Sequence, residues 1–583
     1  MALKLVQFAH NWLDNFRLRL AYTDALPQLT LLGMLSGLAA ALVIVLFRLA
    51  IDEPLDWLLP QGHDDFESLP RIWHFGLPLL GGLILAVFFH FLHPRYRAVG
   101  VTHVLDRLHS HQGHMSSRNL WAQFFGGLIC LATGQSVGRE GPAVHMGAAS
   151  ASIIGRWFRL PNNSMRTLVA CGVAAAISAS FNTPMAGVIF AMEVVLMEYT
   201  IIGFLPVILA SVSGAMLSQI FFGQEIAFTV PAIHLNSLWE LPFIAMGGLL
   251  IAVVASLFIQ MVVRLVPFQR KPVALRMLLA GLVTGIAAYW VPEIMGIGYD
   301  TVDRAMAGEL GLHALLLIVF VKLIITATVF GLGIPGGSIG PTLFMGACIG
   351  GLLGILAQLT APTLASSPAV YVLLGMGGMM AAVLNAPLAA LLALLELSAS
   401  HTIIFPGMLM VVIACITTRL LVRNNGLFQE ILIAQGKKAR TGIAGQILAR
   451  VGIESVLERN FVTCDRRQFY DELRKLLEAQ PDWLLVDELD GKKFLVRPAD
   501  VAQYLEVAPI EELSLEREVD LLKIPAKRLE LASIHSRANL LEAQTRLQQT
   551  GADALYVSRS GAPLLSSAHG IVTRHAINSY YQL

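Results

Sequence analysis

Long apolar stretches alternate with short polar ones from residue 28 to residue 422. Several of them are shorter than the roughly 20 residues that a helix needs to cross about 30 Å of hydrocarbon. Glycine and proline separate many of them, which is typical of helices that stop part-way through a membrane beside a cavity. The pattern predicts an all-α polytopic membrane domain over residues 28–440, with a transport site at the helix breaks. The stretches lie at about 28–50, 75–93, 119–133, 143–157, 165–180, 185–222, 240–266, 275–292, 312–331, 341–360, 367–398 and 404–422.

The pattern changes after residue 440. In residues 441–583, 37 of 143 positions are charged, against 44 of the first 440. Short apolar strands alternate there with amphipathic helices, so we expect a soluble α+β tail. The whole chain is 55% hydrophobic with a mean hydropathy of +0.66, which excludes an ordinary soluble enzyme. Its net charge of +1 gives no reason to expect nucleic acid as a partner.

Basic residues flank the membrane domain on both sides. Residues 1–27 are amphipathic and lack the apolar core and cleavage site of a signal peptide, so we expect a helix on the membrane surface. Lys4, Arg17 and Arg19 precede the first apolar stretch, and a cluster between Arg419 and Arg440 follows the last. The positive-inside rule then predicts that both termini are cytoplasmic. Compact loops favour the inner membrane of a bacterium.

Several landmarks recur in the membrane domain and indicate two related halves. An Asn two residues before a proline recurs with a glutamate nine residues after that proline, and a Gly-Pro pair recurs before Met-Gly-Ala. The matched positions are Asn182 and Asn385, Glu193 and Glu396, and Gly141 and Gly340. Chance matching among small residues is the alternative. The landmarks keep their order at offsets of 203 and 199 residues, which favours a true repeat.

Two glycine-rich stretches, residues 134–142 and 331–341, each open into an apolar helix. Glycine lets backbone amides approach a ligand closely, and proline suits the first turn of a helix. Unpaired amides and the positive end of the helix dipole then make an anion site without a full charge, so an ion can leave as well as enter. The second stretch also fits a dinucleotide pattern, but no strand–helix unit surrounds it.

Glu140 is the most informative single residue of these stretches. An acidic side chain between glycines at membrane depth is costly unless it has a function or a partner. At an anion-attracting helix N-terminus, its carboxylate can occupy the place of the anion, and protonation would release it. A salt bridge with the neighbouring Arg139 is the alternative.

The sequence Gly138-Arg139-Glu140-Gly141-Pro142 resembles the signature of the CLC family of chloride channels and proton-coupled exchangers, and residues 336–341 resemble its second selectivity motif. The resemblance covers residues 28–440. It implies a homodimer with one pore in each subunit, two inverted halves of broken helices, and Glu140 as the gating glutamate. It also implies an anion site at Val99, Gly100, Gly138, Arg139, Gly141, Ser338, Ile339, Gly340 and Phe428.

The match departs from the family at the anion site. The first motif of the family is Gly-Ser-Gly-Ile-Pro, and Val99 stands where its serine would be. Ile339 replaces a usual phenylalanine, and Phe428 replaces the tyrosine that lends a hydroxyl to the central anion. The anion is then left mainly to backbone amides, which puts the selectivity among chloride, nitrate and bromide in doubt.

A second departure concerns protons. Exchangers of this family carry an inner glutamate directly after the position of Glu193, and here that residue is Val194. We therefore predict a channel-like or weakly proton-coupled pathway, with an antiporter that uses a non-standard internal proton site as the alternative. Glu193 could serve as a substitute relay, or Glu193 and Glu396 could be structural carboxylates near helix ends.

Four histidines, His103, His109, His111 and His114, follow the first anion motif. We interpret them as a solvated loop that gains charge in acid, with metal binding as the less favoured alternative. The five cysteines have no paired spacing for a disulfide or a zinc site, so no metal is expected.

The tail resembles a tandem pair of CBS domains, at about 450–505 and 520–583, of the kind that binds adenine nucleotides in many proteins. The ribose-binding pattern is only partly present: the first copy has Arg497 and Asp500, and the second has Thr573 followed by His575. Asp500 and Thr573 are the candidate nucleotide contacts, and a structural tail without nucleotide is the alternative. No cofactor is required by any other feature.

Two other classes of function were weighed. An intramembrane enzyme needs converging nucleophile–base pairs or metal ligands, and the sequence offers only isolated carboxylates. A receptor with a sensing tail would not require glycine-proline breaks in both halves. The sequence therefore predicts a non-enzymatic, glutamate-gated transporter of chloride and other small anions in a lipid bilayer, with protons as a further candidate substrate.

Overall fold

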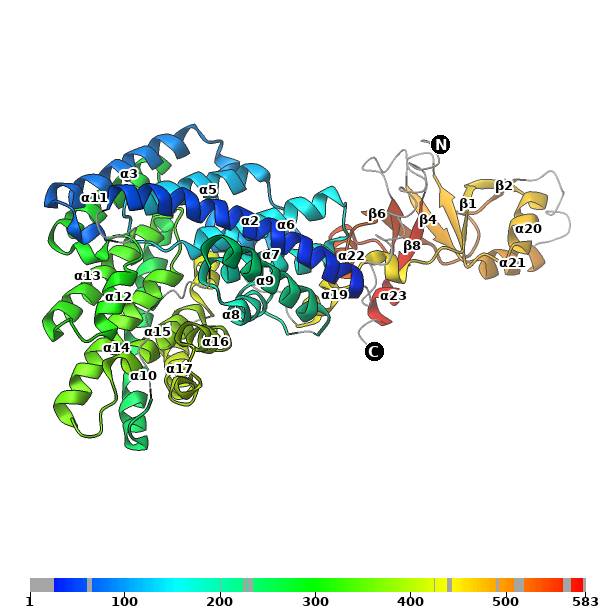
Figure 1. Cartoon of the computed structure of the whole chain (residues 1–583). Helices are drawn as coiled ribbons and strands as arrows, with labels where there is room; N and C mark the ends of the chain where they lie inside the picture. Colours follow the sequence, from blue (N-terminus) through cyan, green and yellow to red (C-terminus); the bar gives the residue numbers. More distant parts are fainter. Residues whose placement is uncertain are drawn as a thin grey trace. The chain divides into compact units, whose positions relative to one another are not determined.

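The computed structural model describes residues 26–59, 65–199, 201–223, 228, 234–423, 425–437, 443–488, 492–507, 518–558 and 568–579. These residues form two compact units (Figure 1). The helical unit comprises Leu26–Phe158 and Met165–Arg440, and the strand-containing unit comprises Arg159–Ser164 and Thr441–Leu583. The surface helix predicted over residues 1–27 lies outside the described residues, except for the last two, which begin the first helix drawn.

The helical unit is all-α, as the hydrophobic pattern predicts. Its helices are α2 (Leu26–Leu58), α3 (Arg71–Phe91), α4 (Gly100–Ser110), α5 (Ser117–Ala132), α6 (Glu140–Trp157), α7 (Asn162–Phe181), α8 (Pro184–Phe190), α9 (Ile201–Phe222), α10 (Leu241–Leu265), α11 (Val273–Trp290), α12 (Tyr299–Met306), α13 (Leu312–Gly331), α14 (Ile339–Thr360), α15 (Pro368–Leu384), α16 (Pro387–Ser398), α17 (Ile404–Val422) and α18 (Leu427–Ala434). A single π-helical turn, Ala191–Leu196, continues α8.

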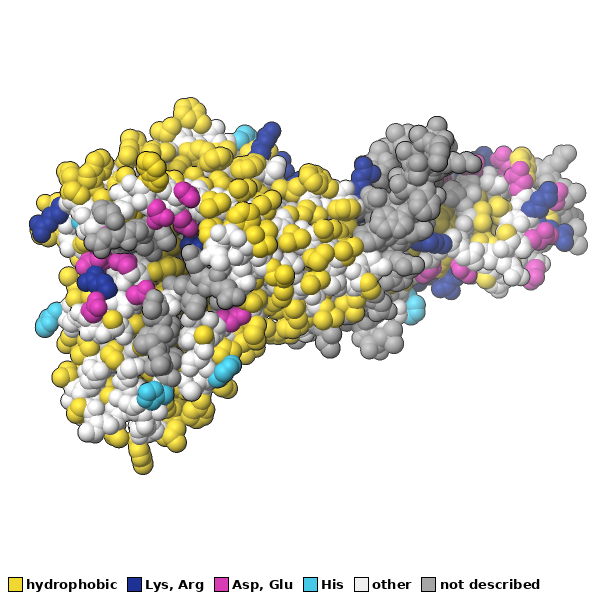
Figure 2. All heavy atoms as spheres, viewed as in Figure 1, with side chains coloured by type: hydrophobic (Ala, Val, Ile, Leu, Met, Phe, Trp, Pro, Cys, Tyr) yellow, Lys and Arg dark blue, Asp and Glu magenta, His cyan; other side chains and the backbone are white. Residues whose placement is uncertain are grey.

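Helix lengths divide this unit into spanning and broken elements. Within the described part of the chain, nine helical segments are long and apolar enough to cross a membrane. The apolar helices Pro184–Leu196, Pro368–Leu384 and Pro387–Ser398 are shorter, as expected of helices that stop part-way. Figure 2 shows hydrophobic side chains widely spread over the visible surface of the helical unit, whereas the coloured part of the strand-containing unit mixes charged and hydrophobic side chains.

Small residues let the helices pack closely. On α2, Gly37 lies so near α9 that an added Cβ would meet the Ala210 carbonyl oxygen at 2.6 Å. The opposite face of α2 exposes large leucines, among them Leu31, which is 52% exposed, and Leu46, also 52% exposed. In water such a stripe would be costly, so this face is one that lipid would cover.

The internal repeat of the sequence corresponds to a repeated structure. In the first half, an added Cβ on Gly147 of α6 would lie 2.3 Å from the Gly172 carbonyl oxygen of α7. In the second half, an added Cβ on Gly346 of α14 would lie 2.3 Å from the Gly375 carbonyl oxygen of α15. Asn182 and Asn385, which follow α7 and α15, both have left-handed backbones, with φ of 58° and 55°. The two halves therefore share helix order, close crossings and turns.

The strand-containing unit repeats one β-α-β-β-α order twice. The first copy comprises β1 (Phe461–Asp465), α20 (Tyr470–Glu478), β3 (Trp483–Asp487), β4 (Lys493–Val496) and α21 (Pro498–Val507). The second comprises β6 (Leu529–His535), α22 (Leu540–Thr550), β7 (Ala554–Ser558), β8 (Gly570–Thr573) and α23 (Arg574–Ser579). All six strands form one sheet in the order β1-β3-β4-β6-β7-β8, and each copy has a parallel pair followed by an antiparallel one. This order supports the tandem repeat that the sequence predicts for the tail.

The segments that lead into the two copies exchange partners. Val451 and Ile453, which follow α19 (Ile443–Ala449), pack in the core of the second copy, and the Ile453 amide donates to the Ala538 carbonyl oxygen at 2.8 Å. Leu521 and Ile524 instead pack in the core of the first copy. The sequence boundaries 450–505 and 520–583 follow chain order, whereas each packed core also includes the segment that precedes the other copy.

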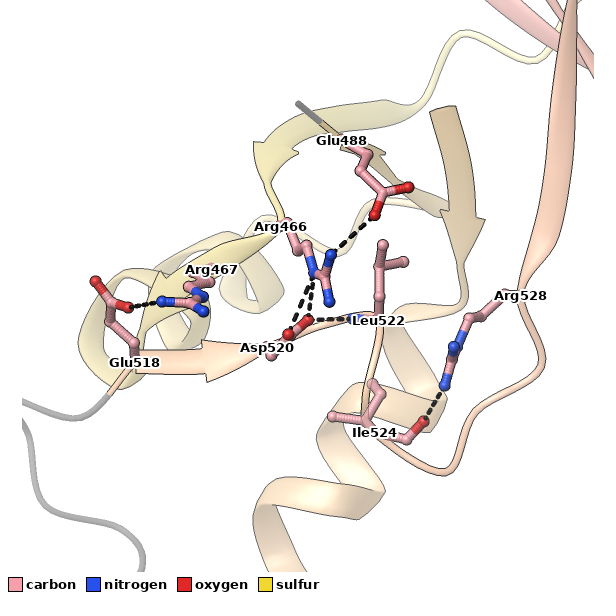
Figure 3. Close-up of polar contacts among 8 residues, drawn as sticks. All are labelled: Arg466, Arg467, Glu488, Glu518, Asp520, Leu522, Ile524 and Arg528. Atoms are coloured by element: carbon pink, nitrogen blue, oxygen red, sulfur yellow. Dashed lines mark hydrogen bonds and ion pairs between the residues drawn. The ribbon is translucent and has the colours of Figure 1, made fainter. Parts of the chain in front are cut away.

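A small polar cluster holds the second leading segment in place (Figure 3). The short strands β2 (Arg467–Phe469) and β5 (Glu518–Asp520) pair antiparallel. Next to them, the Arg466 guanidinium donates to Asp520 Oδ1 at 3.0 Å and to Glu488 Oε1 at 2.8 Å. The hydrogen bond from Arg466 lowers the pKa of Asp520, because it favours the ionised carboxylate.

Candidate functional site

The two glycine-rich stretches meet each other in the centre of the helical unit. The Gly138 amide donates to the Gly337 carbonyl oxygen at 2.8 Å, and the Gly337 amide donates to the Gly138 carbonyl oxygen at 2.7 Å. The contact leaves no room for side chains, since an added Cβ on Gly141 would lie 2.5 Å from Gly337 Cα. Glycine is therefore required by close backbone approach, and the N-terminal ends of α6 and α14 are brought together.

Glu140, the first residue of α6, lies at the N-terminus of α14. Its side chain is fully buried, and its carboxylate accepts a hydrogen bond from the Gly340 amide at 3.0 Å. Gly340 is in the first turn of α14, where backbone amides have no partner within the helix. The carboxylate thus occupies the place that the sequence analysis assigned to an anion at this helix end.

Tyr299, the first residue of α12, holds the Glu140 carboxylate from another side. Its hydroxyl donates to Glu140 Oε1 at 3.2 Å. The ring packs edge-to-face on Phe228 with centroids 4.9 Å apart, and the Arg139 guanidinium lies over it at 5.7 Å. Sequence reasoning missed Tyr299, because it is 159 residues from Glu140 and belongs to no recognisable motif.

The loop that leads to Tyr299 is fixed by a buried lysine. Lys322 of α13 is fully buried, and its Nζ donates to the carbonyl oxygens of Ile294 at 2.9 Å and Gly296 at 3.1 Å. The Gly296 amide also donates to the Gly134 carbonyl oxygen at 3.3 Å, at the start of the first glycine-rich stretch. A buried ammonium within a membrane span is costly unless it is so paired, so Lys322 has a positioning role for this loop.

A cavity of about 20 Å³ lies next to Tyr299. Its lining includes Asp52 and Arg139 together with apolar side chains of α2 and of the Tyr299 loop. Such a volume holds about one water molecule, and its polar lining gives that water partners. Asp52 lies near the C-terminal end of α2, which comprises 33 residues.

Other residues of the predicted anion site surround Glu140 at the start of α14. Ser338 immediately precedes α14, is 1% exposed, and its hydroxyl has no hydrogen-bond partner among the described residues. Ile339 is also buried. Arg139 donates from Nη2 to the Ser180 carbonyl oxygen at 3.2 Å, and its guanidinium lies over the Tyr299 ring. Ser338 is the side chain best placed to offer a hydroxyl to an anion here.

In the first predicted anion motif, at Val99 and Gly100, the backbone amide of Gly100 is already hydrogen-bonded, whereas free amides were expected. Val99 precedes α4 and Gly100 begins it with φ of +82°, but the Gly100 amide donates to Gln123 Oε1 at 2.7 Å. The same Gln123 donates to the Pro335 carbonyl oxygen at 2.8 Å, which links α4 through α5 to the second glycine-rich stretch. No described heavy atom lies within 4 Å of an added Cβ on Gly100, so open space adjoins this helix start.

Phe428 is the second residue of α18 (Leu427–Ala434), the helix that packs against α4. Gly426, with φ of +104°, turns the chain into α18, and Phe428 is 3% exposed. Its ring packs edge-to-face on Phe330 with centroids 6.5 Å apart. Helix α18 contacts α4, α4 contacts α6, and α6 contacts α14, so the helices that carry the predicted anion-site residues pack on one another in turn.

Glu193 and Glu396 cap each other's neighbouring helices. The Glu193 carboxylate accepts from the amides of Leu388 at 3.3 Å and Ala389 at 2.8 Å, at the start of α16. The Glu396 carboxylate accepts from the amides of Met185 and Ala186, both at 2.8 Å, at the start of α8. This reciprocal arrangement satisfies orphan helix amides with charge of the favourable sign. Val194, at the position of the exchanger glutamate, is 7% exposed.

The structure corrects the sequence interpretation for His103 and His109 but not for His111, which follows α4 and is exposed. A solvated loop was expected, but residues 100–110 form α4, and His103 is only 6% exposed. His109 Nδ1 bonds the carbonyl oxygen of Leu105 in its own helix at 2.7 Å. The physical reason is the amphipathic pattern of the segment, which places His103 on the face packed against α6. Among the described residues no cluster of ligands suited to a metal occurs.

The two candidate nucleotide contacts lie at the strand-to-helix junction that ends each copy of the tail, but at different positions of it. Asp500 is in the first turn of α21, and Thr573 ends β8 just before α23. The Thr573 hydroxyl donates to Glu458 Oε1 at 3.2 Å, so a ribose would have to compete with this carboxylate. Nucleotide binding at Asp500 and Thr573 stays a prediction.

Comparison with known proteins places this architecture. Residues 81–419 match the model of the family described as voltage gated chloride channel. A protein of Ralstonia nicotianae described as ClcB-like is 30% identical over 401 residues, which cover 67% of this chain and 92% of that protein. The H(+)/Cl(-) exchange transporter ClcA of Vibrio cholerae is 28% identical over 388 residues, covering 64% of this chain and 82% of the transporter.

Solved structures share the fold. A slow cyanobacterial Cl-/H+ antiporter aligns with a TM-score of 0.63 and 21% identity, covering 71% of this chain and 99% of the antiporter. A eukaryotic CLC transporter aligns over 94% of this chain and 97% of its own, with a TM-score of 0.57 and 20% identity. The family match spans more than half of the chain and coincides with the paired helix breaks. The chain therefore belongs to the voltage gated chloride channel (CLC) family, whose members are membrane channels and transporters and not enzymes.

Proposed function

We propose that this protein transports chloride and other small anions across a membrane through a pathway gated by Glu140. The observation that carries the proposal is the position of the Glu140 carboxylate, which accepts a hydrogen bond from the Gly340 amide at the N-terminus of α14. An anion would use the same amide, because a helix N-terminus binds negative charge of either origin. The side chain and the anion are thus competitors for one place.

Protonation resolves this competition. A neutral carboxyl group loses the attraction of the amide and of the helix dipole, so the side chain can leave and an anion can enter. The proposed cycle needs no cofactor. Protons reach the gate from the cavity beside Tyr299 or from the opposite side, and the second route needs a titratable group, since Val194 can neither bind nor pass a proton.

The family match and the positive-inside bias support further parts of the proposal. We place the chain in a bacterial inner membrane with both termini in the cytoplasm, as a homodimer with one pathway in each subunit. The repeated β-α-β-β-α order supports a CBS-like pair in the tail. The relatives of the whole chain include proteins named as proton exchangers. Chloride/proton antiport is therefore the second candidate function.

Chloride efflux from liposomes that contain the purified full chain tests this function. Wild-type protein should release chloride at a rate that rises as the pH falls. E140Q mimics the protonated gate, so its flux should no longer depend on pH. An E140Q flux with the wild-type pH dependence would show that Glu140 is not the gate.

A further inference from the structure

Two histidines form a buried pair between α4 and α6. His103 Nδ1 and His145 Nε2 are 2.8 Å apart, and the rings lie nearly parallel with centroids 5.1 Å apart. His145 is fully buried and His103 is 6% exposed. Neither ring has a role in the anion site described above.

The short N···N contact constrains the protons of both rings. A neutral imidazole has one N–H donor and one acceptor nitrogen, so one ring must donate to the other. If His103 Nδ1–H donates, His145 carries its proton on Nδ1. If His145 Nε2–H donates, His103 Nδ1 is the acceptor and His103 carries its proton on Nε2. The two arrangements differ only in which nitrogens hold the protons, and at most one ring can be charged.

The second ring nitrogen of His145, Nδ1, has no hydrogen-bond partner in the part of the chain that the structure describes. It is buried and unbonded among the described residues, in either tautomer of the pair. A buried polar atom left in this way costs about 1–3 kcal/mol. A purely structural pair gains nothing from an unpaired nitrogen. A nitrogen that exchanges protons with a transient water, by contrast, must have no permanent hydrogen-bond partner.

The pair lies in the first two turns of α4 and α6, with Glu140 earlier on α6 and the Asp106–Lys437 ion pair further along α4. His145 follows Glu140 by five residues on α6, a rise of about 7.5 Å along the helix axis. On α4, Asp106 is one turn beyond His103, and its Oδ2 bonds the Nζ of Lys437 at 2.8 Å. Lys437 is 39% exposed and belongs to the basic cluster that the positive-inside rule places in the cytoplasm.

Several charged groups face the pair. The titratable and charged groups around it are Arg107, Asp106, Lys437 and His111. Burial of both rings, together with the cations Arg107 and Lys437 set against the single carboxylate of Asp106, disfavours a positive charge on the pair. A proton that enters must therefore be passed on while another leaves, which is the behaviour of a relay and not of a stable charge.

We propose that His103 and His145 are the internal proton site of this protein and carry protons between the cytoplasm and Glu140. A proton binds Nε2 of His103 as its Nδ1 proton moves to Nε2 of His145, and His145 releases its Nδ1 proton towards Glu140 through water. One proton enters and one leaves, and both rings end neutral. The first tautomers return when each ring loses its Nε2 proton to water and gains a proton from water on Nδ1, because ring rotation alone moves no proton between the nitrogens. This assignment rests on chloride/proton antiport, the second candidate function above, and identifies the titratable group that Val194 does not supply.

The test measures chloride and proton movement together in liposomes that contain the full chain. H145Q and H103N keep an amide nitrogen where the bonded ring atom stands, so each preserves the contact but cannot relay a proton. H109N is the matched control, because His109 is on the same helix and its Nδ1 bonds only its own backbone. An outward chloride gradient is applied at equal pH, and the external pH and chloride are recorded.

We expect wild type and H109N to move protons against their gradient, and H103N and H145Q to move more than about tenfold fewer protons per chloride, the scale on which a positioned proton carrier acts. Wild-type proton coupling in both variants, or chloride flux without proton movement in wild type, would overturn the assignment. An absence of chloride flux in wild type would instead overturn the proposed function.

Each variant breaks the relay alone, so either one suffices if the other fails to fold. If neither folds, NMR of the wild type with 15N-labelled histidine decides. Interconversion of both tautomers supports the relay, and one fixed tautomer refutes it.

Discussion

Replacing Tyr299 by phenylalanine should loosen the gate without removing it. The change deletes one hydrogen bond to the Glu140 carboxylate and leaves the Gly340 amide in place. A phenylalanine ring keeps the edge-to-face contact with Phe228 and the position beneath Arg139. The perturbation is therefore confined to the hydroxyl that donates to Glu140.

The size of the effect follows from the geometry of that bond. Hydrogen bonds to charged groups contribute about 1.5–3 kcal/mol to stability. The O···O distance of 3.2 Å is longer than the usual value of about 2.7–2.8 Å, so the lower end of that range applies. About 1.5 kcal/mol corresponds to about tenfold in an equilibrium constant. In Y299F, the population of Glu140 side chains that have released the Gly340 amide should be about ten times that in the wild type.

Chloride efflux at neutral pH measures this population, provided that Tyr299 acts through Glu140. Y299F should raise the efflux by up to about tenfold in the wild-type background, and by less than about twofold when combined with E140A, because coupled residues are not additive. An equal gain in both backgrounds would show that Tyr299 obstructs the pathway itself. No gain in either would refute the role of this hydroxyl.

Three further predictions concern the anion site, the helix caps and the tail. V99S and F428Y add hydroxyls at the starts of α4 and α18, so we expect tighter anion binding or an altered chloride/nitrate ratio, measured by calorimetry; no change in either would place both residues off the site. E193Q and E396Q should each lower the thermal unfolding temperature in detergent to a similar extent, since each weakens a helix cap worth about 1 kcal/mol. Loss of proton movement in E193Q alone, without a loss of stability, would instead identify Glu193 as a relay. Asp520 has a lowered pKa in the folded tail, so its pairing with Arg466 stabilises the tail above its unfolded pKa of about 3.9 and the stabilisation is lost as the pH falls through the folded pKa. D520N should therefore lower the unfolding temperature of the tail at pH 7, and the difference from wild type should shrink below about pH 4; an equal difference at both pH values would refute this linkage.

Sequence alone was sufficient for the features that depend on local pattern. The apolar stretches predicted an all-α membrane domain, and the glycine-rich breaks at 134–142 and 331–341 predicted helix starts within it, because hydrophobicity, glycine and proline act on their own segment of chain. The family followed from the same residues. Local pattern also predicted the α+β tail after residue 440, whereas its β-α-β-β-α order came from the structure.

Contacts between distant residues were decided only by the tertiary structure. The Glu140 carboxylate meets Gly340 and Tyr299, which are 200 and 159 residues away, and no spacing in the sequence encodes those meetings. The histidines of α4 were misjudged for a related reason. Four histidines in a polar stretch suggest a solvated loop, but His103 is buried because α6 covers its face of the helix. The chemistry of a buried polar group depends on which partners the fold places beside it, and the chain order does not record them.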